Sequence, residues 1–337
     1  MNIDEIYMQL ALNKAWEYQG LTYPNPAVGA VVTLNGKILA LEAHQKAGTS
    51  HAEVLALLSA YETLSNTHIG FDSKDAQKAH TFLLSLPKDF FSQCSIYVTL
   101  EPCSHKGKTP SCASLLQSLN LLKVVIGIKD PIEGHDGGAD IVGRSVLSPT
   151  IIIGVLEEEC KALLEPFMIW QKRAFVLFKL AQTTNGQIGG GYLSCKASLR
   201  HVHQLREVCN TLLIGGNTVR VDRPTLDSRL TEGQAPNIKI YSKEDNFDRD
   251  IPLFNIQNRD VEIVDKLDFL ERPSFVMVEG GGGLLNALKE KIDWMLIYQT
   301  PKLSTNNLTY NTTMNLQFLH QVKKDVDLMI WSRQIGH

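Results

Sequence analysis

The sequence predicts two consecutive α/β domains, and three observations support this fold class. The chain has 337 residues, which is longer than one typical domain and long enough for two. Short apolar runs alternate with stretches of helical character, as in proteins whose helices are layered on a sheet. This alternation restarts after Arg173 with a new apolar run, FVLFKLAQT. We therefore expect a first domain at 1–172 and a second at 173–337.

The first domain is expected to begin with a helix at 2–19, in which Asn2 is the N-cap and two acidic residues occupy the first turn. The dipeptide Asn35-Gly36 separates two apolar runs and predicts a β-hairpin, because both residues tolerate positive φ. A further helix is expected to open at His51.

A long stretch at about 60–94 follows, and the sequence assigns it no function. Beyond it, hydrophobic periodicity predicts strands at 95–102, 123–131 and 150–156 and helices at 113–122 and 157–173. In the second domain it predicts strands at 175–183, 211–216, 274–280 and 294–301, helices at 196–208 and 284–292, and loops around short strands at 231–259.

The composition indicates an ordinary globular enzyme and disfavours several other classes. Hydrophobic residues make up 44% of the chain and charged residues 20%. The formal net charge is −3, and no basic run marks a nucleic-acid binder. No apolar stretch approaches the length of a membrane span, and the acidic start does not resemble a signal peptide. Six cysteines without a secretion signal suggest a reducing compartment, so we expect a cytoplasmic enzyme.

His51, Cys103 and Cys112 form a candidate zinc site. Zinc prefers nitrogen and sulfur ligands in tetrahedral geometry, and a catalytic site keeps one of its four positions for water. His51 and Cys112 both stand at the predicted start of a helix, where the helix dipole favours a thiolate. Two thiolates also cancel the charge of Zn²⁺. We therefore expect one catalytic zinc ion in the chain.

Glu53 lies two residues after His51, on a different side of the first helical turn. At this position it is poorly placed to bind the metal but well placed to move protons. A glutamate with this role, which is not a metal ligand, characterises zinc nucleobase deaminases. The predicted reaction is hydrolytic attack on an amidine-like ring carbon, with ammonia as the leaving group.

The alternative is that the two cysteines are buried core thiols or part of a structural zinc site, with His51 capping a helix. Each residue alone favours that interpretation. Together, the motif H-A-E and the motif E-P-C after a strand favour the catalytic site. The remaining cysteines are expected to be structural: Cys94, Cys160, Cys195 and Cys209.

The segments PNPAVGAVV, HQKAGTSHAE, VTLEPCSHKGKTPSC and IKDP resemble the deaminase half of the bifunctional riboflavin-biosynthesis deaminase–reductases. The resemblance implies a cytidine-deaminase-like three-layer α/β/α fold for the first domain. It also implies a small-molecule substrate, a diaminopyrimidinone that carries a ribosylamino 5-phosphate. Ordinary cytidine deaminases have P-C-x-x-C, so the longer SHKGKTPS insert between the cysteines is expected to recognise this substrate.

By the same resemblance, Asn25 and His44 contact the base or ribose, and Lys108 and Asp130 fix the remaining polar groups. The alternative for each is an exposed loop residue. Where the family often has Asn after its K-D-P, this chain has Ile132.

Two strands of the second domain end in glycines, in TLLIGG and in EGGGG. Backbone N–H groups in such turns attract phosphates, and two turns in one α/β domain suit a dinucleotide. KLAQTTNGQI, LLIGGNTVRVDRPTLDSR and VEGGGGLLNAL resemble the reductase half of the same family, whose fold is similar to dihydrofolate reductase. The resemblance implies NADPH as the hydride donor to C1′ of the opened ribose, although the residues alone do not separate NADPH from NADH.

Carried over residue by residue, this resemblance assigns the nucleotide to Thr218, Asp222, Gly281, Gly282 and Gly283. It assigns the substrate side to Lys179, Arg206, Leu226, Arg229 and Glu279. Asn185 and Arg223 depart from the family pattern, which leaves open a deaminase whose second domain is mainly structural. A nucleic-acid-editing deaminase is a further alternative, but its basic footprint is missing. The family implies a homodimer formed through the reductase domain.

Overall fold

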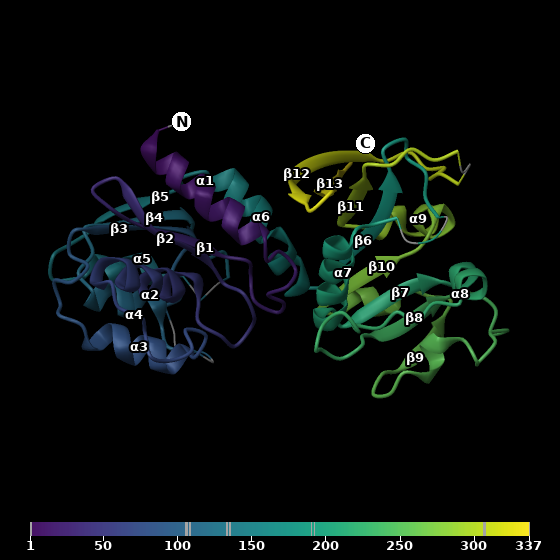
Figure 1. The fold of residues 1–337 in the computed structure, drawn as a ribbon, viewed down its shortest axis with the longest axis horizontal. Coiled ribbons are helices and arrows are strands. Elements are labelled where there is room, and N and C mark those ends of the chain that lie inside the picture. Colours follow the sequence, from purple (N-terminus) through teal and green to yellow (C-terminus); the bar gives the residue numbers. More distant parts are fainter. Residues whose placement is uncertain are drawn as a thin grey trace. The chain divides into compact units, whose positions relative to one another are not determined.

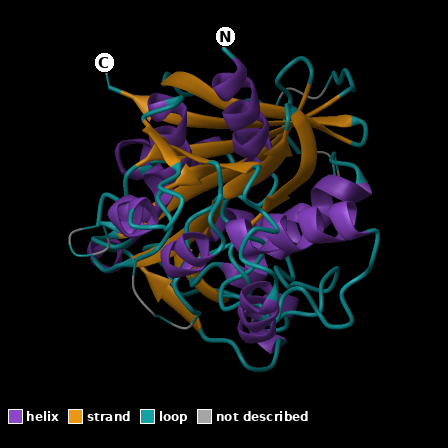
Figure 2. Ribbon diagram, turned by 90° about the vertical axis from the view of Figure 1, so that its left-hand side faces the viewer, coloured by secondary structure: helices purple, strands orange, loops and turns teal. Residues whose placement is uncertain are grey.

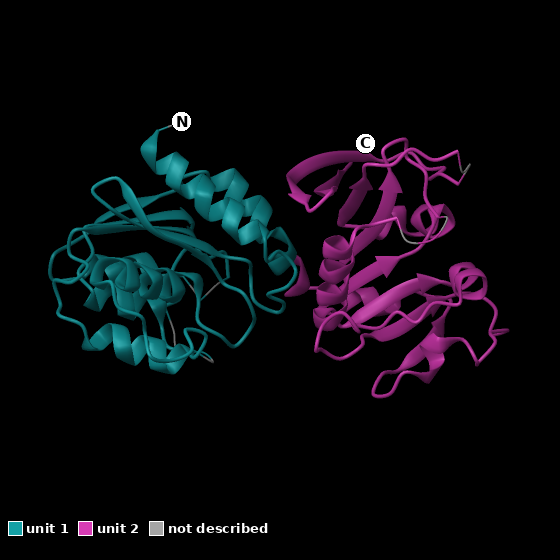
Figure 3. Cartoon of the chain, in the orientation of Figure 1, with its two compact units in different colours: residues 1–168 teal, residues 169–337 magenta. Residues whose placement is uncertain are grey.

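The structure is a computed structural model that describes residues 2–104, 107, 109–132, 134, 136–189, 191, 193–305 and 308–336. Contacts between residues divide the chain into two compact units, Met1–Met168 (unit 1) and Ile169–His337 (unit 2), which Figure 3 colours separately. Among the described residues, no helix has both the length and the apolar character needed to cross a membrane. Each unit is described by itself below.

The sheet of unit 1 has the strand order β2-β1-β3-β4-β5. Its strands are β1 (Gly29–Leu34), β2 (Lys37–Ala43), β3 (Cys94–Leu100), β4 (Lys123–Ile128) and β5 (Thr150–Ile153). The first three strands pair antiparallel, whereas β3, β4 and β5 are parallel. The predicted hairpin is confirmed, since Asn35 and Gly36 join β1 to β2 with φ values of 50° and 80°.

Helices cover both faces of this sheet, giving the three-layer α/β/α arrangement visible in Figure 1. The helices are α1 (Ile3–Trp16), α2 (Ala52–Ser65), α3 (Ala76–Ser85), α4 (Cys112–Ser118), α5 (Gly138–Gly143) and α6 (Glu157–Trp170). The expected N-cap of α1 is confirmed, because the Asn2 side chain accepts a hydrogen bond from the Glu5 N–H. The helix ends at Trp16 rather than at residue 19, and the chain then turns through Gly20, which has a φ of 80°.

The main core of unit 1 lies between the sheet and the helices α2, α4 and α5. Helix α3 belongs to the stretch at 60–94 and packs on α2 and α4, outside the sheet layer. Its Phe82 ring lies 4.8 Å from the ring of Tyr61 in α2, measured between centroids. The sequence analysis predicted neither α3 nor α5.

The sheet of unit 2 has the strand order β12-β13-β11-β6-β10-β7-β8-β9. The strands are β6 (Ala174–Thr183), β7 (Thr211–Gly215), β8 (Asn237–Tyr241), β9 (Val261–Val264), β10 (Ser274–Glu279), β11 (Trp294–Thr300), β12 (Asn315–Lys324) and β13 (Asp327–Ile335). Neighbouring strands from β11 to β9 run parallel, and the C-terminal hairpin of β12 and β13 extends the sheet antiparallel.

The α-helices of unit 2 are α7 (Lys196–Val208), α8 (Gly216–Asp222) and α9 (Gly282–Leu288) among the described residues, and Figure 2 distinguishes helices from strands throughout the chain. Helix α7 has the predicted bounds. The helix expected at 284–292 is α9 followed by a 3₁₀ turn at Lys289–Lys291. Two further 3₁₀ turns lie at Pro252–Asn255 and Asp268–Glu271.

Candidate functional site

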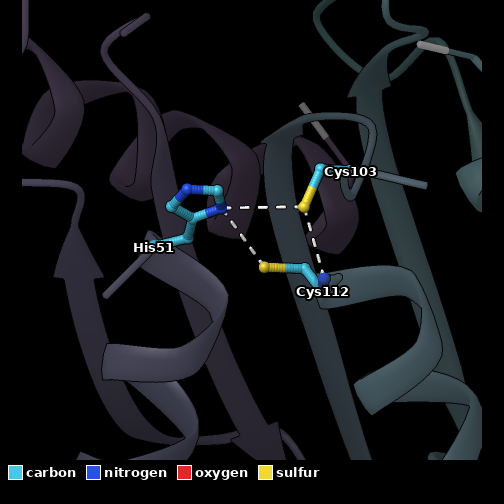
Figure 4. A group of neighbouring side chains, drawn as sticks. All are labelled: His51, Cys103 and Cys112. Atoms are coloured by element: carbon cyan, nitrogen blue, oxygen red, sulfur yellow. Dashed lines mark hydrogen bonds between the residues drawn. The ribbon is translucent and has the colours of Figure 1, made fainter. Parts of the chain in front are cut away.

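His51, Cys103 and Cys112 come together where two helices begin beside the sheet of unit 1, as Figure 4 shows. His51 is the N-cap of α2, where its backbone is extended and its side chain makes no capping hydrogen bond. Cys112 is the first residue of α4. Cys103 follows β3, near the edge where the parallel strands β3 and β4 end. The fold therefore converges three ligands from segments that are far apart in the sequence.

The distances within this cluster fit a tetrahedral zinc ion. His51 Nδ1 lies 3.7 Å from Cys103 Sγ and 3.4 Å from Cys112 Sγ. Zinc–nitrogen and zinc–sulfur bonds of ordinary length, set at the tetrahedral angle, separate N and S by about 3.6 Å. The Cys112 N–H also donates to Cys103 Sγ at 3.3 Å, which holds that sulfur in place. One nitrogen and two sulfurs are donors that zinc prefers, so this donor set fits the metal.

The surroundings of the two cysteines also favour a negative charge on the pair. A hydrogen bond from Cys112 lowers the pKa of the Cys103 thiol to about 4, and His51 contributes to this shift, while burial opposes it. The pKa of Cys112 is raised, first by its hydrogen bond to Cys103 and then by burial. The pair thus readily provides a thiolate, the form in which cysteine binds a metal.

Glu53 lies in the first turn of α2 and is only 4% exposed. Burial raises the pKa of its carboxyl group, and the neighbouring Cys103 charge adds to this effect, although His51 opposes it. The side chain is in hydrogen-bond contact with Cys112. A carboxyl group that keeps its proton more strongly than a solvated one can alternate between acid and base near neutral pH.

Asn25 and His44, both predicted substrate residues, lie together beside this cluster. The Asn25 amide nitrogen is 3.1 Å from His44 Nε2. His44 Nδ1 is 3.1 Å from the carbonyl oxygen of Ser50 and therefore donates to it, so Nε2 accepts from Asn25. The His44 ring packs edge-on against His51 with centroids 5.3 Å apart. Burial, followed by the charge of His51, lowers the pKa of His44 to about 4, so this imidazole stays neutral.

Two further residues support the cluster, and the sequence analysis missed both roles. Thr109 Oγ1 lies 3.2 Å from His51 Nε2, on the side of the ring opposite the sulfurs. Glu101 is buried and accepts hydrogen bonds from the backbone N–H of Asp130, at 3.0 Å, and of Ala139, at 2.8 Å. Glu101 therefore ties the loop of the predicted substrate residue Asp130 to the end of β3. In the sequence, the position of Glu101 directly before Pro102 and Cys103 was the one signal for this role.

Gly138 allows helix α5 to pack closely against the chain at Pro102, next to the metal ligand Cys103. A Cβ atom at Gly138 would lie 1.9 Å from the carbonyl oxygen of Pro102, so only glycine lets α5 approach the cysteine loop. The carboxylate of Asp130 accepts from the Ile132 N–H at 2.9 Å, which shapes the loop that follows β4. The predicted substrate residue Lys108 lies outside the described residues.

In unit 2, three of the predicted substrate residues form one ion cluster. Lys179 and Glu279 are register partners on the parallel strands β6 and β10. Glu279 accepts from Lys179 Nζ at 3.0 Å and from Arg206 Nε at 2.7 Å and Nη2 at 3.0 Å. Burial alone would raise the pKa of Glu279, but Arg206 and Lys179 hold it well below its usual range. The cluster therefore contains a fixed carboxylate between two cations.

Leu226 and Arg229 lie on the loop after α8. The Arg229 side chain is 52% exposed and pairs with Asp227 at 3.1 Å. Arg206 connects this loop to the ion cluster, because its Nη1 donates to the carbonyl oxygen of Asp227 at 3.1 Å. Leu226 has a φ of 55°, and its carbonyl accepts from Arg259 at 2.8 Å. Arg259 thus holds this loop, a role that the sequence analysis did not predict.

The two glycine turns lie side by side, because β7 and β10 are adjacent parallel strands. A Cβ atom at Gly215 would approach Leu284 of α9 to 3.6 Å, so the two turns share one packing surface. Thr218 and Asp222 lie on α8, directly after β7, and Gly281 caps α9 after β10. Ligands of open α/β sheets bind at the carboxyl ends of the strands. The open space around Gly281 and Gly283 fits the close approach of a dinucleotide.

The positions that depart from the expected pattern are occupied by local contacts. Asn185 accepts from the Thr183 hydroxyl at 2.7 Å and donates to the carbonyl of Ser304 at 2.8 Å. Arg223 ends α8 with a φ of 45° and pairs with Asp248 at 2.7 Å. Neither residue disturbs the ion cluster around Glu279.

Comparison with known proteins assigns families to both halves of the chain. The family model described as "Cytidine and deoxycytidylate deaminase zinc-binding region" matches residues 1–128. The model described as "RibD C-terminal domain" matches residues 174–304. These ranges contain the cysteine and histidine cluster and the ion cluster, respectively.

Similar proteins span nearly the whole chain. The riboflavin biosynthesis protein RibD of Aquifex aeolicus is 32% identical over 352 aligned residues, which cover 91% of this chain and 89% of the relative. RibD of Actinobacillus pleuropneumoniae is 34% identical, and the match covers 68% of this chain and 56% of the relative. A solved structure from Thermotoga maritima has a TM-score of 0.66, 26% identity and 99% coverage of both chains. That protein is a diaminohydroxyphosphoribosylaminopyrimidine deaminase/5-amino-6-(5-phosphoribosylamino)uracil reductase.

Proposed function

Because the chain belongs to the family of the bifunctional riboflavin biosynthesis protein RibD, we propose that the cluster in unit 1 and the cluster in unit 2 are its two active sites. The chain is an enzyme of riboflavin biosynthesis that combines a zinc-dependent deaminase with an NADPH-dependent reductase. Its substrate is a small phosphorylated pyrimidine. The observation that carries the proposal is the tetrahedral spacing of His51, Cys103 and Cys112 around a site that Glu53 borders.

The first reaction is hydrolytic deamination of 2,5-diamino-6-(5-phosphoribosylamino)pyrimidin-4(3H)-one. His51, Cys103 and Cys112 would hold the zinc ion, which would supply the Lewis acidity that activates water. The Glu53 carboxylate would accept a proton from the attacking water and deliver it to the leaving amino group, a task that suits its raised pKa. Asn25 and the neutral His44 contact the base or ribose, and Asp130 together with Lys108 fixes the remaining polar groups.

The second reaction reduces the ribosyl group to ribityl and gives 5-amino-6-(5-phosphoribitylamino)uracil. NADPH supplies the hydride, so the protein contributes mainly positioning. Thr218, Asp222 and the turn Gly281–Gly283 hold the nucleotide. Lys179, Arg206 and Glu279 form the wall against the substrate, with Leu226 on the adjoining loop. Arg229 is half exposed and suits the 5-phosphate.

We further propose that the enzyme is a cytoplasmic homodimer that binds no nucleic acid. A homodimer formed through unit 2 is supported by the edge strand β12, whose Phe318 is 66% exposed. The net charge of −3 argues against a nucleic-acid partner. The free cysteines of the metal cluster suit the reducing cytoplasm.

The test is a paired assay with the purified protein loaded with one zinc ion per chain. With the diaminopyrimidine riboside phosphate and NADPH, we expect ammonia release and NADPH oxidation. Glu53→Gln keeps the shape of the side chain but removes the proton shuttle, and ammonia release should fall by at least about a hundredfold. Zinc content should stay at one per chain. Unchanged deamination in this variant would refute the role of Glu53, and ammonia without NADPH oxidation would refute the second activity.

A further inference from the structure

Arg259 makes four hydrogen bonds to three backbone carbonyl groups of unit 2. It lies in the connection from β8 to β9, just before β9 begins. Its Nη1 donates to the carbonyl of Leu226 at 2.8 Å, and its Nη2 donates to that of Thr225 at 2.6 Å. Nη2 and Nε also donate to the carbonyl of Leu253, at 2.6 and 3.2 Å. Burial lowers the pKa of Arg259 to about 10, so the guanidinium is still charged at neutral pH and its hydrogen bonds are strong.

Leu253 anchors this contact in the interior of unit 2. It belongs to the 3₁₀ turn at Pro252–Asn255 and has no exposed surface. Its N–H donates to the carbonyl of Pro224 at 3.1 Å. Arg259 and Leu253 therefore hold the loop after α8 together. Both belong to the polar stretch at 231–259, for which the sequence predicted only loops around short strands.

Thr225 and Leu226 direct successive carbonyl groups to one guanidinium. In an extended segment, successive peptide units point to opposite sides. Leu226 instead has a φ of 55°, in the left-handed region, which turns the two carbonyl groups to the same side. A leucine adopts this conformation at a cost, so the conformation persists where surrounding contacts enforce it. The hydrogen bonds from Arg259 are such contacts.

The same geometry determines the direction of two N–H groups. The one cis peptide bond among the described residues joins Tyr23 to Pro24, so the peptide bonds of the turn are trans. In a trans peptide the N–H points opposite to the C=O. The N–H groups of Leu226 and Asp227 therefore both point away from Arg259, and neither donates to an acceptor in the described part of the chain. Neighbouring N–H groups that point the same way form a concavity that binds anions.

The turn is connected to the groups assigned to the reductase substrate. Arg206 donates to the carbonyl of Asp227 at 3.1 Å and also binds Glu279 of the ion cluster. The Asp227 carboxylate pairs with Arg229, with both oxygens 3.1 Å from Nη1. The negative charge of Asp227 is thus balanced and does not oppose an anion at the turn.

We propose that Arg259 is a positioning residue of the reductase, whose guanidinium holds the left-handed turn at Leu226 so that the N–H groups of Leu226 and Asp227 bind the substrate phosphate beside Arg229. The identity of this ligand rests on the proposed function of unit 2. Arg259 acts through the backbone of the turn and not through a contact with the substrate. The stretch at 231–259 thereby determines how strongly a phosphorylated substrate binds.

The experiment compares Arg259→Ala and Arg259→Lys with wild type and with Arg249→Ala. Arg249 lies in the same stretch, but its side chain is 56% exposed and pairs with Asp245. NADPH oxidation gives kcat and KM for the deaminated intermediate and for its dephosphorylated form. We expect Arg259→Ala to raise KM about tenfold for the phosphorylated form alone, with kcat nearly unchanged, because the N–H donors lose their alignment. Arg259→Lys should raise it less, since an ammonium group keeps the charge but not the planar donors. Arg249→Ala should match wild type.

Two measurements separate positioning from a general loss of structure. NADPH binding, followed by NADPH fluorescence, should be equal in all variants. Methylguanidinium added to Arg259→Ala should lower the raised KM toward that of wild type. The proposal is overturned by an unchanged KM in both Arg259 variants or by an equal rise of KM for both substrates. Weakened NADPH binding in both variants would also overturn it, because Arg259 would then support the whole unit.

Calorimetry with ribose 5-phosphate tests the turn without the reaction. Binding to wild type should be about tenfold tighter than binding to Arg259→Ala. Equal binding to the two proteins would refute the positioning role even if wild type reduces the intermediate. If wild type does not oxidise NADPH with the intermediate, the proposed function of unit 2 fails, and a difference in ribose 5-phosphate binding would still support the role of Arg259.

Discussion

The orientation of the His51 imidazole determines whether its Nδ1 can bind a metal together with the two cysteines. His51 directs Nδ1 toward both sulfurs, so its proton resides on Nε2 when a metal is bound. The Thr109 hydroxyl lies 3.2 Å from Nε2 and accepts this proton in a hydrogen bond. Partners of this kind fix the tautomer and the orientation of a metal-binding histidine. Thr109 is therefore expected to strengthen metal binding without touching the metal.

Replacing Thr109 by Val keeps the size of the side chain and removes the acceptor. We expect zinc affinity to fall by about ten- to a hundredfold, measured by competition with a chromophoric chelator. Thr109→Ser retains the hydroxyl and should restore most of the affinity. Equal dissociation constants for Val and Thr would show that the contact does not support the metal.

A second histidine, His201 of unit 2, makes stability depend on pH. It is buried, its Nδ1 lies 2.6 Å from the Tyr298 hydroxyl oxygen, and burial lowers its pKa from 6.5 to about 3. Between these values the unfolded chain binds a proton that the folded chain does not, so acid favours unfolding. The contribution to the unfolding free energy should fall by up to about 1.4 kcal/mol per pH unit below 6.5.

Urea denaturation of wild type and His201→Gln at pH 7.5, 6.5 and 5.5 measures this effect. Because glutamine does not titrate, the variant should lose less stability than wild type between pH 6.5 and 5.5. Parallel curves for the two proteins would exclude His201 as the source of the pH dependence.

At the level of secondary structure, the register of β6 and β10 is decisive for unit 2. It places Lys179 opposite Glu279, and Arg206 on α7 completes the cluster. All three groups are largely buried, so each needs the others. Removing one partner of a buried ion pair leaves an unpaired charge, which typically costs about 3–5 kcal/mol.

Glu279→Gln should therefore lower the unfolding free energy by about 3–5 kcal/mol at pH 7 and abolish NADPH oxidation. The matched control is Glu262→Gln. Glu262 also pairs with its register partner on a parallel neighbour, Lys239, but it is 61% exposed at the sheet edge. Its loss should cost less than about 1 kcal/mol. A similar cost for both variants would contradict the buried-cluster interpretation.

Acid should erase the difference between wild type and Glu279→Gln. The pKa of Glu279 is lowered in the folded state, so its contribution is complete above the ordinary value of 4.5 and declines below it. The stability gap between the two proteins should narrow as the pH falls from 4.5. A constant gap across this range would mean that the carboxylate charge is not what stabilises the cluster.

Much of the element order could be predicted from the sequence, but some elements could not. The strands of both sheet centres are long apolar runs, and Asn35-Gly36 marks its hairpin unambiguously. Helix α5 has only six residues and begins with glycine, so it carries almost no helical pattern. In β12, most side chains are exposed or half-buried, which removes the apolar alternation of a strand. These elements form through tertiary pairing rather than through local preference.

The residues of the candidate sites also differ in whether the sequence alone can predict them. The convergence of His51, Cys103 and Cys112 could be predicted because metal chemistry requires particular residue types at particular positions. The roles of Glu101 and Arg259 could not be found, because both depend on carbonyl and N–H groups that become neighbours only after folding.

For the whole molecule, two compact units with separate clusters predict separable activities. Glu53→Gln should abolish ammonia release but leave NADPH oxidation on the deaminated intermediate. Lys179→Ala should do the opposite. A mixture of the two variants should convert the first substrate to the final product, since the intermediate is a free small molecule. Failure of the mixture, with both single activities present, would mean that both sites must belong to the same chain.

The ligands of the metal cluster are separated by a long stretch of chain, and this has a consequence for biogenesis. His51 leaves the ribosome well before Cys103 and Cys112, and the central strand β3 still awaits its neighbour β4, which ends at Ile128. A nascent chain therefore cannot retain zinc in this geometry until most of unit 1 has been synthesised. Prematurely terminated fragments that stop before Cys112 lack the complete ligand set. Zinc binding in this geometry would thus follow synthesis of the chain at least as far as Cys112.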